Sequence, residues 1–116
     1  MLNRSVVMLT PRQPYLDWAA GLDDSGLSPR PEDEKTIYLI PEYGDNIEAM
    51  EILSRCYDII FEMELEGWHM DESAWPVDRT FKKFRDWFTI EFHSVVEDLC
   101  DFPVADYDEE FLGTTQ

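Results

Sequence analysis

Three side chains, His69, Glu91 and His93, are of the types that support acid–base or metal chemistry. Glu91 and His93 lie two positions apart in a stretch with strand-like alternation, so both side chains should lie on one face of a strand. Imidazole and carboxylate groups suit zinc, iron or manganese if His69 folds back over this pair. The spacing nevertheless matches no compact motif such as H-x-x-x-H or H-E-x-x-H. We expect no metal and no cofactor, and the alternative, a small metal-dependent or acid–base enzyme built on these three residues, stays open.

Other patterns for catalysis are absent from the sequence. Ser73 and Ser94 lack the G-x-S-x-G turn that exposes a catalytic serine, and neither Cys56 nor Cys100 lies among basic residues that would activate its thiol. No glycine precedes a Lys-Ser or Lys-Thr pair, which argues against a phosphate-binding loop. The segment HMDESAWPVD lacks the glycine and the closing glutamate of a calcium-binding loop, so we expect Asp71 to form local hydrogen bonds instead.

The stretch 67–94 combines aromatic and basic residues in an otherwise acidic chain. It holds both histidines, three of the four tryptophans and four of the nine basic residues, while the chain as a whole carries a net charge of −17. Aromatic and arginine side chains anchor many protein interfaces. The candidate interaction patch comprises Trp68, Trp75, Arg79, Lys82 and Lys83. The alternative is that the tryptophans belong to the core and the basic residues pair with an acidic helix of the same molecule.

Carboxylates recur at steps of three and four residues in the longest periodic segment of the chain. This acidic face comprises Glu48, Glu51, Asp58, Glu62 and Glu66. A row of carboxylates repeats the field of a phosphate backbone and could block a basic surface on an enzyme or toxin. The alternative is an ordinary solvated helix face, interrupted by Arg55. The same net charge disfavours direct binding of nucleic acid or of an anionic membrane.

The first forty residues have the periodicity of two strands and one short helix. Residues 5–10 are apolar on both faces and stop at Pro11, which indicates a buried strand. A short helix is expected from Pro14 to the glycine at position 21. Residues 22–35 have the composition of a solvated loop, and residues 36–40 are β-branched and aromatic, as in a second strand.

A long amphipathic helix is the clearest element of the second half. It should begin at Asp45, whose side chain can cap it, and end at Gly67 in a left-handed cap. A short helix is expected over about 79–88, capped by Asp78 and with its phenylalanines packed inward. From residue 89 to residue 99 the pattern becomes that of a strand.

These elements predict an α+β fold in the order β-α-β-α-α-β. The expected architecture is a single small domain over residues 1–100, with a short three-stranded mixed sheet, one long helix and two short ones. If the first two strands are neighbours joined through the first helix, they should be parallel with a right-handed crossover. Residues 101–116 are acidic and end in small polar residues, so we expect a loosely attached tail.

The cysteines and the lengths of the apolar runs indicate in which cellular compartment the protein is expected. Cys56 and Cys100 lie among apolar neighbours and show no metal spacing, so they are expected to be buried free thiols. No run of apolar residues approaches the roughly 20 that a membrane helix requires, and the run at residues 6–9 is too short for a signal peptide. These features favour a cytoplasmic protein without membrane contact.

Three segments carry a resemblance to a group of proteins. PYLDW (14–18), YLIPEY (38–43) and LEGWHMDESAWPVDRTFKKFRDWFTIEFHSVVEDL (65–99) resemble short acidic bacterial proteins that are uncharacterised in function. The resemblance spans most of the chain except the tail. It implies a free-standing small bacterial protein, and it brings no reaction, ligand or partner.

The sequence therefore favours a non-catalytic protein that works by binding, with another protein as the partner and a homodimer as one form of that partnership. Two alternatives remain. One is the small enzyme that uses His69, Glu91 and His93, and the other is an acidic inhibitor or immunity-type protein that blocks a basic surface.

Overall fold

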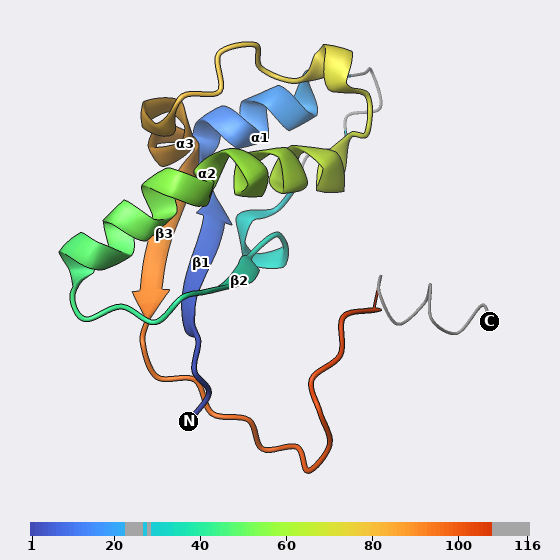
Figure 1. Ribbon diagram of the computed structural model, residues 1–116. Coiled ribbons are helices and arrows are strands. Elements are labelled where there is room, and N and C mark those ends of the chain that lie inside the picture. The colour runs from blue at the N-terminus through green and yellow to red at the C-terminus, as the bar shows by residue number, and fades with distance from the viewer. Residues whose placement is uncertain (23–26, 28, 108–116) are drawn as a thin grey trace.

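The structure is a computed structural model, and it describes residues 1–22, 27 and 29–107 (Figure 1). The described elements follow the expected order and confirm an α+β fold with one long helix and two short ones. They are β1 (Ser5–Pro11), α1 (Gln13–Ala20), β2 (Thr36–Ile40), α2 (Asn46–Trp68), α3 (Phe81–Trp87) and β3 (Phe88–His93), with single 3-10 turns η1 (Pro31–Asp33) and η2 (Glu72–Ala74).

The three strands form one sheet in the order β2-β1-β3, and both pairings are antiparallel. The expected mixed sheet, with β1 and β2 parallel, is therefore wrong. A parallel pair needs a connection that carries the chain back to the starting end of the first strand. The eight residues of α1 span only about 12 Å, and α1 lies beyond the end of β1 (Figure 1), so the chain enters β2 from the same end of the sheet.

Side chains of β1 alternate between the two faces of the sheet, and Val6 is buried although it lies on the face opposite the helices. Ser5, Val7 and Leu9 are fully buried. The other face, which we call the open face, carries alternate residues that are paired across the strands. The open face comprises Val6, Met8 and Thr10 of β1, Ile37 and Leu39 of β2, and Thr89, Glu91 and His93 of β3.

The helices lie on the buried face and close the core against it. Leu53, Phe61 and Leu65 of α2 are fully buried, as is Phe84 of α3. Aromatic rings make much of this contact, and Phe61 packs edge-on against both Phe84 and Phe88, with ring centroids 5.6 and 5.7 Å apart. The inward packing expected for the phenylalanines is thus confirmed. Because the helices lie on the buried face, no helix covers the open face in the part of the chain that the structure describes.

Helix ends agree in part with the sequence patterns. Asp45 caps α2, since its side chain accepts a 2.8 Å hydrogen bond from the Glu48 N–H. Gly67 does not end the helix in a left-handed cap, because α2 continues through Trp68 and the N–H of the next residue donates to the Leu65 carbonyl. The cap of α3 is Thr80 rather than Asp78.

The third strand is shorter than expected and leads into an extended segment. β3 ends at His93. The chain then stays beside the N-terminus, where the Leu2 N–H donates to the Val96 carbonyl at 2.8 Å and the N-terminal ammonium lies 3.1 Å from Glu97. Residues 98–107, which we call the C-terminal arm, then leave the body of the protein (Figure 1). The radius of gyration is 16.1 Å, whereas a compact chain of this length has roughly 13 Å.

The arm also bears on two expectations from the sequence. Cys100 is exposed and Cys56 is half-buried, so the prediction of two buried thiols is wrong. Cys100 lies on the arm, outside the apolar interior that its neighbours suggested. Of the expected tail, residues 101–107 are exposed, and residues 108–116 lie outside the described residues.

Candidate functional site

Glu91 and His93 form a close pair on the open face. His93 Nε2 lies 2.7 Å from Glu91 Oε2, and each side chain is about half exposed. The two-residue spacing on β3 brings them together, as the strand alternation predicted. The pair is an exposed polar element at one side of the sheet.

His69 lies on the other side of the sheet from this pair. It follows the last residue of α2, where its N–H donates to the Leu65 carbonyl at 2.9 Å and its own carbonyl accepts from Trp75 Nε1 at 2.7 Å. Among the described residues, no three His, Cys, Asp or Glu side chains are placed to hold a metal ion. The constellation of His69, Glu91 and His93 is therefore not assembled in this fold.

The tryptophans of the expected interaction patch contribute to the core. Trp75 is 6% exposed, and the Trp68 indole lies against the core with its Nε1 3.4 Å from the Ala19 carbonyl. The loop that carries Trp75 is closed onto α1 by a 2.9 Å hydrogen bond from Trp18 Nε1 to Ala74. The expectation of an exposed patch at Trp75 is wrong, because the loop folds the indole inward.

Two basic side chains of that patch, Arg79 and Lys82, have ion-pair partners within the molecule. Arg79 lies 3.6 Å from Glu62 and has its guanidinium 5.8 Å from the centre of the Trp75 ring. Lys82 pairs with Asp86 at 3.1 Å. Lys83 is half-buried, and its backbone N–H donates to the side chain that caps α3. The alternative that the basic residues pair with the acidic helix of the same molecule therefore describes Arg79, whereas Lys82 pairs within its own helix α3.

The acidic face of α2 lies on the surface as the sequence pattern predicted. All five carboxylate side chains are exposed: Glu48, Glu51, Asp58, Glu62 and Glu66. The Asp71 carboxylate, also exposed, accepts hydrogen bonds from the hydroxyl and the N–H of Ser73, which lower its pKa. These local bonds confirm the expected role of Asp71 in its loop.

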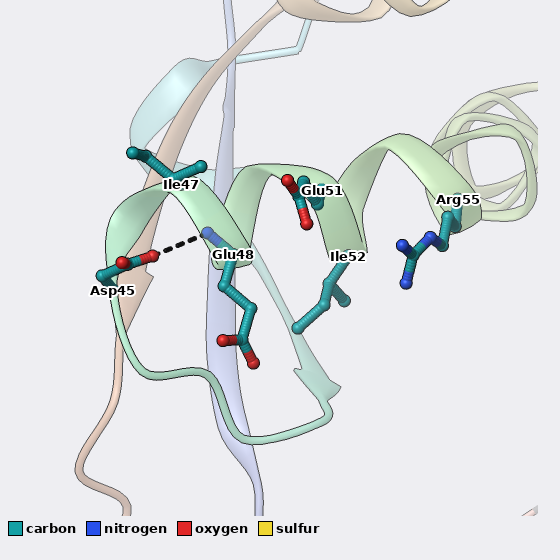
Figure 2. A pocket seen from close by; sticks show the side chains of 6 residues that line it. All are labelled: Asp45, Ile47, Glu48, Glu51, Ile52 and Arg55. Atoms are coloured by element: carbon teal, nitrogen blue, oxygen red, sulfur yellow. Dashed lines mark hydrogen bonds between the residues drawn. The ribbon is translucent and has the colours of Figure 1, made fainter.

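Two shallow hollows flank the start of α2. One, of about 450 Å³, is lined by Asp45, Ile47, Glu48, Glu51, Ile52 and Arg55 (Figure 2). Figure 2 shows that Glu48 and Ile52 extend from the same side of the helix while Ile47 points away from them, so the lining groups do not converge on one point. The second, of about 470 Å³, is lined mostly by apolar atoms and includes Met50 and Phe81. Neither hollow contains the histidines.

A buried carboxylate, Glu64, is the residue that the sequence patterns missed. Its side chain is 9% exposed, and Glu64 Oε2 accepts a 2.6 Å hydrogen bond from the Tyr38 hydroxyl. Burial raises the pKa of Glu64, and nearby Glu34 raises it further, whereas hydrogen bonds from Tyr38 and Thr36 lower it. Burial also raises the pKa of Tyr38.

The backbone of Glu64 is tied into the same region. Its carbonyl accepts a 2.9 Å hydrogen bond from the buried Tyr15 hydroxyl, and burial raises the pKa of Tyr15. The signal for Glu64 was its position three residues after Phe61 and four after Ile60, on the apolar side of α2. The hydrogen bonds from Tyr15 and Tyr38 join α1, α2 and β2 through Glu64.

The open face is the most unusual surface of the molecule. Ile37 and Leu39 of β2 are 61% and 53% exposed, and they are paired with Met8 and Val6 of β1. An antiparallel sheet with one solvated face normally carries polar side chains on that face. Here an apolar quartet, Val6, Met8, Ile37 and Leu39, lies beside the polar pair on β3.

Comparison with protein-family models, with curated proteins and with solved structures gave no significant match. The resemblance to short acidic bacterial proteins therefore stays a prediction. Within the described ranges, no helix is both long and apolar enough to cross a membrane.

Proposed function

We propose that this protein works by binding another protein through the open face of its sheet, without catalysing a reaction. The observation that carries the proposal is the exposure of Ile37 and Leu39, 61% and 53%, on a face where solvated sheets carry polar residues. Clustered apolar side chains at a surface are typical of a protein interaction site.

The surroundings of the apolar quartet support the same function. Glu91 and His93 border it on the β3 side, and both remain half exposed. An apolar centre with a polar border is the usual arrangement of a protein interface. In this proposal the pair orients a partner by hydrogen bonding, and acid–base chemistry is not required of it.

Burial of the exposed surface would provide useful binding energy. Ile37 and Leu39 are each more than half exposed, and complete burial of such a side chain contributes roughly 1.5–3 kcal/mol. Covering what is exposed of both should therefore contribute about 2–3 kcal/mol, a substantial part of the free energy of a moderate complex.

Affinity capture from the native host, with the partner identified by mass spectrometry, tests the proposal. The wild-type chain is compared with Leu39→Asp, which places a charge in the centre of the open face. Val77→Asp is the matched control, because Val77 is 91% exposed and lies outside the sheet. We expect a partner that binds wild type and Val77→Asp and is lost with Leu39→Asp. A partner retained equally by Leu39→Asp would contradict the use of the open face.

The acidic face of α2 supports a second candidate function, the blocking of a basic surface on another protein. Its five carboxylates are exposed along the helix, and the Glu62 carboxylate is the member with an ion pair, to Arg79, among the described residues. Binding of this kind weakens steeply as salt is added, since it depends on charges across the interface. A captured partner whose affinity does not change between low and high salt would exclude this candidate.

A further inference from the structure

The same chain that exposes Ile37 and Leu39 of the apolar quartet also carries an extended segment with exposed apolar side chains. In the C-terminal arm, Leu99 is 97% exposed, Phe102 65%, Val104 69% and Tyr107 85%. Side chains of this size bury a large area when they dock. The chain thus presents two exposed apolar surfaces, and neither covers the other.

The base of the arm is held beyond the end of the sheet. Leu2 donates to the Val96 carbonyl, and Glu97 contacts the N-terminal ammonium, so the β1 and β3 segments continue side by side past the last strand residue. The arm departs from this point and runs away from the body of its own chain (Figure 1). This geometry presents the arm to another molecule rather than to its own open face.

The charges around the two surfaces are complementary. Arg4 and Lys35 precede β1 and β2 at positions that continue the alternation of the open face, and both are exposed. Within the described residues, neither makes an ion pair. The arm contributes Asp98 and Asp101 beside its apolar side chains. The open face also carries the Glu91 carboxylate, so Arg4, Lys35 and Glu91 together leave a net positive charge there. In a chain of net charge −17, this favours an acidic, apolar occupant.

We infer that the open face binds the C-terminal arm of a second copy of this chain, so that two copies exchange arms in a symmetric dimer. The inference rests on the proposed function, in which the open face binds protein, and it names the partner. Twofold symmetry covers both apolar quartets and both arms at once, because each copy donates one arm and receives one.

The oligomeric state of the full chain tests this inference. Sedimentation equilibrium of the wild type should give a concentration-dependent mass that reaches two chains of 13.7 kDa. Leu39→Asp, which alters the face, and the double variant Leu99→Ser, Phe102→Ser, which alters the arm, should each raise the dimer dissociation constant by about tenfold or more. Val77→Ser, at a 91% exposed site away from both surfaces, should leave it unchanged. Circular dichroism confirms that each variant folds.

Mixing the two variants separates arm exchange from other ways of pairing. The Leu39→Asp chain has an intact arm and the double variant has an intact face, so a heterodimer of the two keeps one complete contact. The mixture should therefore form more dimer than either variant alone at the same total concentration.

Three results would overturn the inference. A wild type that stays monomeric at high concentration excludes the exchange, as does an arm variant that dimerises like wild type, which would indicate pairing of face against face. A mixture that forms no more dimer than its components excludes the reciprocal contact. In each case, loss of a captured partner with Leu39→Asp would still support the proposed function, so the two failures are distinguishable.

Discussion

The Tyr38 hydroxyl on β2 donates a 2.6 Å hydrogen bond to the Glu64 carboxylate on α2, and thereby joins the edge strand of the sheet to the long helix. The carboxylate lies in the protein interior with 9% exposure. A buried carboxylate is tolerated when it is hydrogen-bonded, and here two hydroxyls, of Tyr38 and Thr36, favour its charged form. Stability should therefore depend on pH at this residue.

Glu64→Gln should stabilise the protein at neutral pH. The ordinary pKa of 4.5 for Glu64 is raised in the fold, chiefly by burial. Well below pH 4.5 the carboxyl group is protonated in both the folded and the unfolded protein, so its ionisation does not affect the free energy of unfolding. As the pH rises above 4.5 the unfolded chain releases the proton first, so this residue lowers the free energy of unfolding until the pH passes the folded pKa.

Urea unfolding across this pH range measures the effect. The gain in unfolding free energy of Glu64→Gln over wild type should increase as the pH rises from 4.5, and then level off. Glu66→Gln, at an exposed position of the same helix, should show no such rise. A difference between Glu64→Gln and wild type that does not vary with pH would show that Glu64 has the same pKa in both states.

Tyr38→Phe should destabilise the protein. It removes the donor to Glu64 while it keeps the ring, and the loss of a hydrogen bond to a charged group costs about 1.5–3 kcal/mol. The midpoint of urea denaturation at neutral pH measures this loss. Tyr43→Phe, which removes a hydroxyl without a hydrogen-bond partner among the described residues, is the control and should not shift the midpoint.

Substitutions of Trp75 should destabilise the protein, as expected for a residue of the core. Trp75→Ala should cost about 3–5 kcal/mol, since the indole is 6% exposed. Trp75→Phe keeps most of the packing but leaves the His69 carbonyl without its donor, which should cost about 1–3 kcal/mol. Thermal unfolding measures both, with Val77→Ala as the exposed control. Equal stability of Trp75→Ala and wild type would mean that the indole is not buried in solution.

Ser5→Ala should stabilise the protein by about 1 kcal/mol. Ser5 is fully buried in the central strand, and its hydroxyl oxygen has no hydrogen-bond partner among the described residues. An unsatisfied buried hydroxyl opposes folding, whereas alanine fits the same space without a polar atom. Chemical denaturation of wild type and Ser5→Ala shows whether the substitution raises or lowers the free energy of unfolding. A less stable alanine variant would reveal a bound water or another acceptor for the hydroxyl.

Local patterns predicted most of the fold because they depend on neighbouring residues. The run before Pro11, the cap at Asp45 and the period of α2 each determine an element on their own. The direction of β2 was wrong because it depends on where α1 lies relative to the sheet, and the periodicity of α1 contains no such information.

The candidate site was harder to predict than the elements. Glu91 and His93 meet because two-residue spacing on a strand is a local property. His69 is separated from them because α2 lies on the opposite face of the sheet, which is a tertiary property. The burial of Trp75 depends on the contact between Trp18 and Ala74, which are far apart in the sequence. Glu64 was predictable, since its position on the apolar side of α2 follows from helical spacing alone.

The strand order β2-β1-β3 has a consequence for the synthesis of the chain. The central strand is made first, yet β3, one of its two neighbours, is made last. About 80 residues separate them, so at roughly 5–20 residues per second the ribosome takes roughly 4–16 s to complete the sheet. Throughout that interval β1 has at most one partner, and its apolar run is exposed to chaperones and to other nascent chains.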